Sequence, residues 1–287
     1  LQKAVNDINT GKSEIAALEK IARQNPSLYL RRVLWQIINA LKESKGKEFL
    51  IDSKNLQKMK EAFLRTKSVI KNAVSEGRFI VIRHHNDVDG YAAGFVLEKA
   101  LNSIGYNRNI MRSSSRSPFY DYTDALRDLN NFLSSRSSKP PLVILTDLGS
   151  NEQSISSIKR LKAYDIDFVI IDHHRYDKEN ETEALSFLNP HVFGFGSDLN
   201  AGALATELAL LLEPKLSGVK HIPALSGVAD KSSGEDVESY IKFFCYHFSI
   251  CCFLHTFIEW MQQRLTCFLK ECLVQCCIVL QKIKECS

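Results

Sequence analysis

No cysteine precedes Cys245 in this chain, and all eight cysteines lie between Cys245 and Cys286. None of them forms a Cys-x-x-Cys pair of the kind that binds zinc. A secreted disulfide scaffold would distribute its cysteines through the fold, so we expect no structural disulfides in the main body. The first residues also lack the apolar core of a signal peptide. We therefore expect a cytoplasmic protein with no membrane association.

The chain also has little excess of positive over negative charge. The 287 residues carry a formal charge of only +4, with 45% apolar and 24% charged residues. These fractions are ordinary for a globular protein and the length suffices for a large core. The mildly basic balance permits a nucleic-acid partner without requiring one.

Residues 1–75 are predicted to be helical. Apolar residues recur at helical spacing from Ile15 to Ala22 and again from Leu30 to Leu41, with Asn25-Pro26 between the two helices. A third helix is expected from Ser53 to Ser75. We expect this segment to form a linker or cap for the domain that follows.

Residues 76–240 are predicted to form an α/β domain. Three short apolar runs, at residues 79–82, 142–145 and 168–171, are typical of parallel strands covered on both faces. Helical stretches are expected at about 91–104, 120–133 and 153–163. This alternation predicts a doubly wound, mainly parallel sheet, in which ligands bind beyond the carboxyl ends of the strands.

Residues 241–287 differ from the rest of the chain. The stretch from Phe243 to Leu254 is rich in cysteine and aromatic residues, and His247, His255 and Glu259 interrupt it too often for a membrane span. We expect an atypical helical tail that departs from the natural continuation of the domain.

Four short acidic and histidine clusters carry the functional signal, and three of them directly follow a predicted strand. They are His85-Asn86-Asp87-Val88-Asp89-Gly90, Asp147, Asp172-His173-His174 and Asp230. A single Asp after a strand is usually a helix cap, and Asp147 alone would be read that way. Four such clusters together indicate a site that holds metal ions at the mouth of an open crevice.

The mixture of ligand types indicates the metal. Carboxylates combined with imidazoles favour Mn²⁺, with Mg²⁺, Co²⁺ or zinc as alternatives. The set is too large for one ion and suits two ions that share a bridging Asp, an arrangement used for displacement at phosphorus. His174 is then free to contact the phosphate or to protonate the leaving group. Asp172 is expected to orient an imidazole.

At these residues the chain resembles the DHH phosphoesterase superfamily, and most closely its archaeal RecJ-like single-strand-specific exonucleases. The resemblance covers about residues 76–240 and includes the Asn189-Pro190 and Ala201-Gly202 elements. It implies that His85 and Asp87 hold one manganese ion. The second ion is then assigned to Asp89, His173 and Asp230, with Asp147 bridging the two and His174 facing the scissile phosphate.

The chain departs from the family pattern after the DHH domain. The family continues into a DHH-associated domain with a Gly-Gly-His stretch, and no Gly-Gly-His occurs here. We therefore expect weaker retention of nucleic acid. A RecJ-like exonuclease that acts from the 5′ end is the leading hypothesis. Hydrolysis of short oligonucleotides, cyclic dinucleotides or pyrophosphate and a catalytically silent scaffold in a replication assembly are the alternatives.

Several side chains are candidates for contacts with single-stranded DNA or RNA. Arg83, His84 and Arg175 are predicted to bind phosphate, with Arg112 and Arg116 also near the expected rim of the site. Phe119 and Tyr120 are candidates for base stacking, although core packing is the commoner role for such residues.

Overall fold

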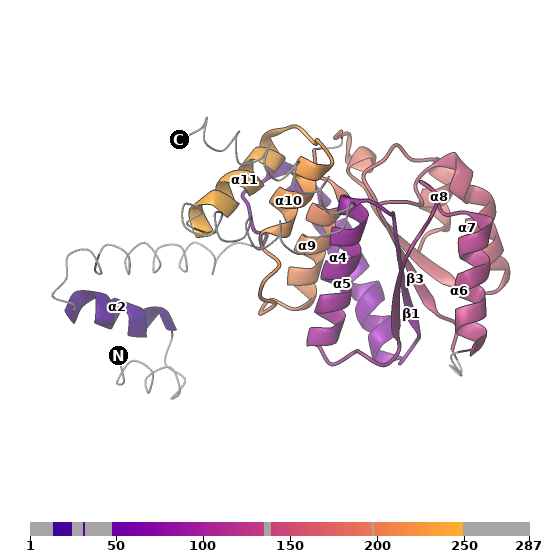
Figure 1. Cartoon of the computed structure of the whole chain (residues 1–287), viewed down its shortest axis with the longest axis horizontal. Helices are drawn as coiled ribbons and strands as arrows, with labels where there is room; N and C mark the ends of the chain where they lie inside the picture. Colours follow the sequence, from indigo (N-terminus) through magenta and orange to yellow (C-terminus); the bar gives the residue numbers. More distant parts are fainter. Residues whose placement is uncertain (1–13, 25–30, 32–47, 135–138, 197, 249–287) are drawn as a thin grey trace, which may run out of the picture. The chain divides into compact units, whose positions relative to one another are not determined.

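The computed structural model describes residues 14–24, 31, 48–134, 139–196 and 198–248 (Figure 1). The chain divides into two compact units, Leu1–Leu50 and Ile51–Ser287. In the first unit, helix α2 (Glu14–Gln24) confirms the first predicted helix and buries Ala22. The second predicted helix lies almost wholly outside the described residues.

The second unit is built on a five-stranded sheet in which every neighbouring pair is parallel. The order is β2-β1-β3-β4-β5. The strands are β1 (Ile80–His84), β2 (Ile110–Ser114), β3 (Leu142–Thr146), β4 (Asp167–Ile171) and β5 (Ser186–Leu188). The predicted α/β class is confirmed, and β1, β3 and β4 are the three predicted runs.

The strand order reverses at β1, which has β2 on one side and β3 on the other. The last residues of the central strands are in register, with His84 opposite Thr146 and Thr146 opposite Ile171. Segments that leave β1, β3 and β4 therefore begin at the same edge, at the point where doubly wound sheets bind their ligands.

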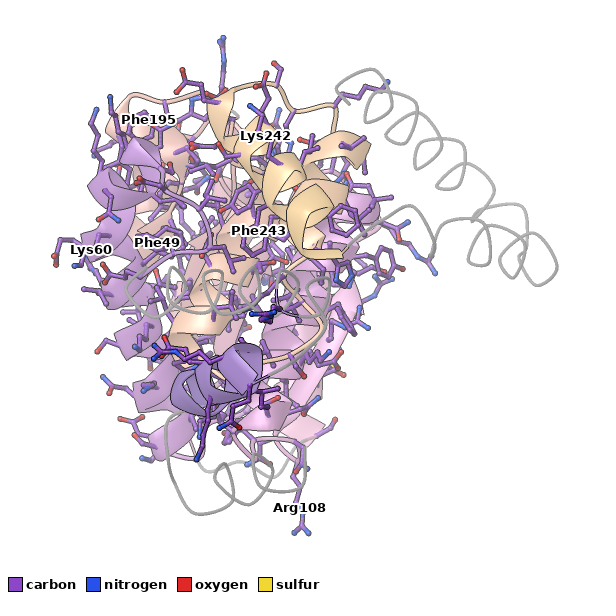
Figure 2. All side chains as sticks on the ribbon, turned by 90° about the vertical axis from the view of Figure 1, so that its left-hand side faces the viewer. Phe49, Lys60, Arg108, Phe195, Lys242 and Phe243 are labelled. Carbon is purple, nitrogen blue, oxygen red and sulfur yellow. The ribbon has the colours of Figure 1, made fainter. Side chains whose placement is uncertain are left out.

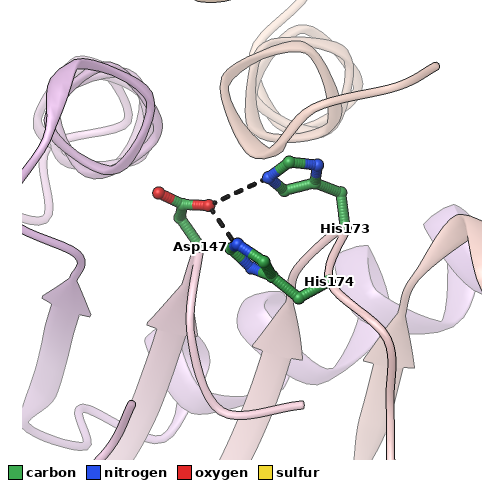
Figure 3. Close-up of side chains that lie close together, drawn as sticks. All are labelled: Asp147, His173 and His174. Atoms are coloured by element: carbon green, nitrogen blue, oxygen red, sulfur yellow. Dashed lines mark ion pairs between the residues drawn. The ribbon is translucent and has the colours of Figure 1, made fainter. Parts of the chain in front are cut away.

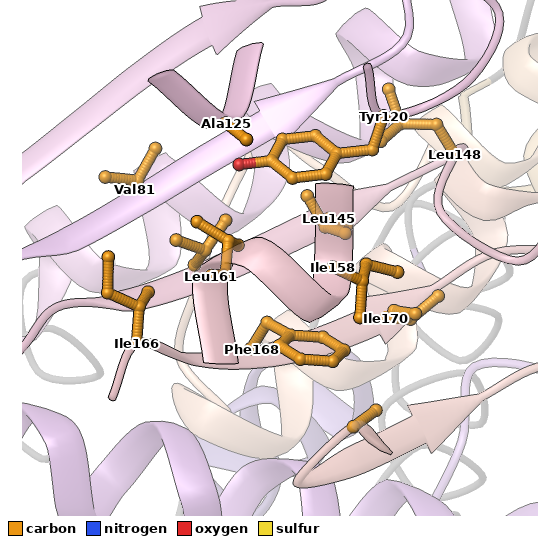
Figure 4. Packing of buried hydrophobic residues seen from close by; sticks show 12 residues of the cluster. Val81, Tyr120, Ala125, Leu145, Leu148, Ile158, Leu161, Ile166, Phe168 and Ile170 are labelled. Carbon is orange, nitrogen blue, oxygen red and sulfur yellow. The ribbon is translucent and has the colours of Figure 1, made fainter. Parts of the chain in front are cut away.

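Helices cover both faces of the sheet (Figure 1). One face carries α6 (Tyr122–Ser134) and α7 (Ile155–Ala163), whose apolar residues pack with Val81, Val143 and Phe168 (Figure 4). The other carries α5 (Val88–Ser103) and α9 (Ala201–Leu212), which pack closely on each other. The remaining elements are η1 (Glu152–Ser154), α8 (Lys178–Glu183), η2 (Pro190–Phe193), α10 (Ile222–Ala229) and α11 (Glu235–Phe248).

Helix α4 (Lys54–Ser75) belongs to the unit that contains the sheet. The hydroxyl groups of Thr66 and Ser186 lie 2.7 Å apart in a buried contact between α4 and β5. Arg65 Nε also donates to the carbonyl oxygen of Leu185 at 3.0 Å. The contacts thus divide the chain after residue 50, whereas the sequence pattern had grouped this helix with the preceding segment up to residue 75.

Helix α11 continues past residue 240, where the sequence pattern changes, and ends at Phe248. Residues 249–287, which hold most of the predicted cysteine-rich tail, lie outside the described residues. Among the helices that the structure describes, none is both long and apolar enough to cross a membrane.

Candidate metal centre

The four predicted clusters meet at the carboxyl edge of the sheet. His85, Asp87 and Asp89 follow β1, Asp147 follows β3, and His173 follows β4. Asp230 completes the set as the C-terminal cap residue of α10. Three groups of these side chains place their ligand atoms within 4.8 Å of one another, namely His85–Asp87–Asp147, Asp89–His173–Asp230 and Asp147–His173–His174.

Asp147 lies at the centre of these groups. Its Oδ2 is 3.4 Å from His85 Nδ1, and its Oδ1 is 3.2 Å from His173 Nε2 and 3.9 Å from His174 Nδ1 (Figure 3). The backbone of Asp147 has a φ of 60°, in the left-handed region that non-glycine residues seldom adopt. Its N–H donates to the carbonyl oxygen of Ile171 at 2.9 Å, which holds this strained turn against the end of β4.

The outer ligands surround Asp147 on two sides. His85 Nδ1 lies 2.8 Å from Asp87 Oδ2. His173 Nε2 lies 3.6 Å from Asp89 Oδ2 and 3.7 Å from Asp230 Oδ2. The side chain of His173 is only 5% exposed, whereas those of Asp87 and His174 are 44% and 49% exposed. The centre is therefore closed beneath His173 and accessible beside Asp87 and His174.

The donor atoms of this centre are oriented for a cation. Both carboxylate oxygens of Asp147, Nδ1 of His85 and Nε2 of His173 are buried without a hydrogen-bond partner within the described chain. Buried polar atoms are otherwise nearly always hydrogen-bonded. These atoms lie close together around one space without forming hydrogen bonds to each other within the described residues. These residues therefore fit divalent cations with oxygen and imidazole ligands.

The electrostatics of the centre agree with this fit. The carboxylates of Asp147 and Asp87 raise the pKa of His85 to about 10. Burial opposes protonation of His173, but Asp147 and Asp89 outweigh it and raise the pKa of that imidazole to about 10. Burial raises the pKa of Asp147, and burial together with the charge of Asp147 raises that of Asp89 to about 8. In the metal-free chain the two imidazoles thus supply positive charge beside the carboxylates, which a bound cation would replace.

Asp89 is held by the first turn of α9. Its two carboxylate oxygens accept the backbone N–H groups of Ala201 and Gly202 at 2.8 and 2.7 Å, and Ser226 Oγ donates to Oδ1. A helix N-terminus favours negative charge because its first N–H groups are unpaired and its dipole is positive there. Asn200 caps the same helix and donates to Ser226 Oγ at 2.8 Å. This network fixes the direction in which Asp89 faces His173.

Asp172 is in none of the three ligand groups but contacts the imidazole of His174. Its Oδ1 lies 2.8 Å from His174 Nδ1 and accepts the backbone N–H groups of His173 and His174. Its Oδ2 accepts the N–H of Ser150 at 3.1 Å. Burial works against the charged form, yet these contacts, led by His174, lower the pKa of Asp172. The expectation that Asp172 orients an imidazole agrees with this geometry.

Two of the predicted phosphate contacts are wrong. Arg83 is 1% exposed, and its guanidinium pairs with Asp128 and lies 3.6 Å from Asp124 on α6. His84 is also 1% exposed, and burial, as the main cause, lowers its pKa to about 4. Arg83 and His84 are the last two residues of β1 and are not part of the following loop. Their side chains therefore lie on opposite faces of the sheet.

The other candidates for substrate contacts differ in exposure. Arg175 is exposed directly after His174, and Arg116 is exposed as well. Arg112 is partly buried and donates through Nε to Glu98 at 2.7 Å. Tyr120 is fully buried in the core and donates to Asp128, so it is not available for stacking. Phe119 is partly buried.

Residue-by-residue reasoning missed the polar side chains that support the ligands. Ser226 and Asn200 orient Asp89, while Asn189 donates to Ser150 Oγ at 3.0 Å and to the carbonyl oxygen of His174 at 2.9 Å. The sequence signal that could have indicated them is the presence of small polar residues near the Asn189-Pro190 and Ala201-Gly202 elements. Their roles depend on partners far away in the chain, so spacing alone could not assign them.

The fold and the site define a parallel α/β phosphoesterase domain with a candidate Asp/His metal centre. Residues 78–225 match the model of the DHH family, N-terminal domain. The chain belongs to this family.

Similar proteins support the assignment. The chain is 32% identical over 246 residues to an uncharacterized protein of Methanocaldococcus jannaschii, and this match covers 78% of the chain and 32% of the relative. It is 31% identical, with a TM-score of 0.64, to the DHH domain of a member of a family of ribosomal proteins, over 76% of this chain and 55% of that one. It also shares its fold with exonuclease RecJ bound to manganese, at 16% identity and a TM-score of 0.51, over 68% of this chain and 48% of that one. The chain thus spans about a third of the curated relative and about half of the solved structures.

Proposed function

We propose that this chain is a Mn²⁺-dependent phosphodiesterase that hydrolyses single-stranded nucleic acid in the manner of a RecJ-like exonuclease. The observation that carries the proposal is Asp147, whose two buried carboxylate oxygens lack hydrogen bonds and face two separate groups of ligands. One shared carboxylate between two sets of ligands suits a pair of ions.

The ligands divide between the two ions as follows. His85 and Asp87 would hold one ion, Asp89, His173 and Asp230 would hold the other, and Asp147 would be shared. The mixture of imidazole and carboxylate favours Mn²⁺, with Mg²⁺ or Co²⁺ as substitutes. When bound, such ions neutralise phosphate oxygens and lower the pKa of water.

His174 is the residue that we assign to proton transfer. Its side chain is half exposed at the open side of the centre, and Asp172 holds its Nδ1. The contact with Asp172 raises the pKa of His174, which favours the protonated ring that a donor to the leaving oxygen requires. Asp172 acts through His174 as a positioning residue.

The choice of substrate rests on the family and on the accessible side of the site. RecJ, which shares the fold, is an exonuclease. Arg175 is exposed beside His174, where a phosphate next to the scissile one would lie. Association with replication proteins is a further expectation of the resemblance.

The test compares the chain with its Asp87→Asn variant on a 5′-labelled single-stranded oligonucleotide and on a small chromogenic phosphodiester. Asn caps a helix as well as Asp does, so α5 should still form. We expect Mn²⁺-dependent turnover to fall by about two orders of magnitude or more, because a charged ligand is lost. The control is Asp165→Asn, the same change at an exposed turn, which should leave turnover unchanged.

The pattern of products distinguishes the candidate functions. Cleavage of both substrates would support the exonuclease. Cleavage of the small diester alone would favour a hydrolase for short oligonucleotides or related small phosphodiesters. If neither substrate is cleaved although Mn²⁺ binds, the enzyme proposal fails and a scaffold role becomes the better explanation.

A further inference from the structure

We infer that His84 is a positioning residue for the metal ligand His85 and thereby sets the affinity of the His85–Asp87–Asp147 group for its ion. The inference rests on the proposed function, because it assigns a role toward the metal centre. It concerns a buried histidine that is not in any of the three ligand groups.

The partners of His84 define the state of its ring. Its Nδ1 lies 2.7 Å from the carbonyl oxygen of His85, and its Nε2 lies 3.3 Å from Arg112 Nη1. A carbonyl oxygen only accepts and a guanidinium only donates. The hydrogen must therefore be on Nδ1, which donates to His85, while Nε2 accepts from Arg112. Glu98 accepts from Arg112 Nε at 2.7 Å and keeps that guanidinium in place.

The surroundings leave the ring little freedom to move. A Cβ atom at Gly94 would lie 2.7 Å from Cδ2 of His84, so any larger residue there would displace the imidazole. On another side the ring contacts Tyr91, with 4.5 Å between the ring centroids and an interplanar angle of 60°. Helix α5 is thus fitted around His84.

The same ring fixes the backbone of the neighbouring ligand. The N–H of His85 donates to the carbonyl oxygen of Thr146 at 3.2 Å, which holds the residue on the side of β3. Its carbonyl oxygen is held by His84 and lies directly beneath Gly90, where a Cβ atom would overlap it. With both peptide groups held, the imidazole of His85 stays near Asp87 and Asp147.

Packing alone does not require a histidine at this place. A purely apolar side chain would fill the space between Tyr91 and Gly94, but it would leave the carbonyl oxygen of His85 and the guanidinium of Arg112 without their partner. Partners that orient a metal ligand typically change metal affinity by about 10–100-fold when they are removed. His84 is placed to have such an effect through the backbone.

The decisive experiment compares His84→Asn with His84→Leu in Mn²⁺ titrations followed by calorimetry and by electron paramagnetic resonance. Asn and Leu have the same shape, but only Asn keeps a donor near the position of Nδ1. We expect the affinity of His84→Leu for one of the two Mn²⁺ ions to fall by about 10–100-fold. The spectrum at one equivalent should then be that of an isolated ion, without the coupling between paired ions. His84→Asn should restore affinity to within a few-fold of the original chain.

A second pair of variants covers the case in which His84→Leu does not fold. Arg112→Met removes the partner of His84 Nε2 at a partly exposed position. The affinity for the same ion should fall by several-fold. Arg108→Met is its control, since Arg108 projects from the loop before β2 (Figure 2), and it should change nothing.

Three results would overturn the inference. Equal Mn²⁺ affinity of folded His84→Leu and His84→Asn would do so, as would an Arg112→Met variant that matches its control. If the unaltered chain binds no Mn²⁺ pair, the proposed function itself fails, and this inference fails with it. Since that last result is seen without any substitution, the two failures are distinguishable.

Discussion

Asp147 Oδ1 and His173 Nε2 lie 3.2 Å apart, yet neither atom has a hydrogen-bond partner within the described chain. The two atoms are close because their residues follow the adjacent strands β3 and β4, whose last residues are in register. Both atoms face a space that the side chains of several candidate ligands share. A buried carboxylate in this situation is a cost to the fold unless a cation is bound.

Asp147→Asn should therefore stabilise the metal-free protein while abolishing its stabilisation by Mn²⁺. Asn tolerates the left-handed backbone at this position and carries no charge to bury. In EDTA we expect the Tm to rise by about 2–4 °C, which corresponds to about 1 kcal/mol in a domain of this size. The original chain should gain roughly 2.7 kcal/mol at a Mn²⁺ concentration of 100 Kd, whereas the variant should gain none.

The control for that experiment is Asp165→Asn. Asp165 also has a positive φ, of 54°, but it is exposed in the turn before β4. This variant should respond to EDTA and Mn²⁺ as the original chain does. A destabilised Asp147→Asn protein in EDTA would show that the carboxylate is already compensated without a metal.

Much of the fold was predictable because three strands are continuous apolar runs covered on both faces. The strands β2 and β5 were not predicted. Strand β2 lies at the edge, is only half-buried and contains Arg112 and two serines, while β5 is only three residues long. Neither has the pattern of a buried strand, and both depend on pairing with a neighbour.

The ligands were predictable to a similar extent. Those that follow β1, β3 and β4 could be found from the strands alone. Asp230 follows helix α10, so the residues placed it among the clusters but only the family resemblance assigned its role as a metal ligand. Arg83 and His84 were misplaced because a charged residue at the end of an apolar run suggests a loop. Their burial depends on Asp128 and Arg112, which are distant in the chain.

Arg83→Met tests the corrected role of that arginine. The substitution leaves Asp128 buried without its counter-charge, while Asp124 keeps its ion pair with Arg127, and we expect the free energy of unfolding to fall by about 3–5 kcal/mol. Urea denaturation measures this loss. Adding Asp128→Asn should recover part of it, because one unpaired charge is removed. Under conditions in which the variant is folded, its Mn²⁺ affinity and its KM should equal those of the original chain. A raised KM without a loss of stability would instead support the phosphate-binding role of Arg83.

Asp172→Asn should separate proton transfer from metal binding. An amide has one acceptor oxygen and so cannot serve both oxygen positions of Asp172, of which Oδ1 accepts two N–H groups and faces Nδ1 of His174 and Oδ2 accepts the N–H of Ser150. We expect Mn²⁺ binding to persist and kcat to fall by about 100-fold or more, the usual range for a misplaced general acid. His174→Gln is the matched variant. Combining the two substitutions should lower kcat no further than His174→Gln alone, and additive losses would mean that the residues act independently.

Ser226→Ala tests the support of the second ligand group. Ser226 Oγ donates to Oδ1 of Asp89 and accepts from Asn200, so its loss removes one of the two donors to that oxygen and weakens the hold on the carboxylate that faces His173. We expect one Mn²⁺ ion to bind about 10-fold more weakly and the free energy of unfolding to fall by about 1–3 kcal/mol. The exposed Ser239→Ala on α11 is the control and should alter neither quantity.

The ion affected by Ser226→Ala should differ from the one that His84→Leu weakens, because the two residues support ligands on opposite sides of Asp147. The double variant should then weaken the binding of both ions, and any departure from additive losses would measure the coupling between the two ions through their shared ligand Asp147. Calorimetry of the four proteins measures this. If both single variants weaken the same ion, the division of the ligands into two groups around Asp147 is wrong.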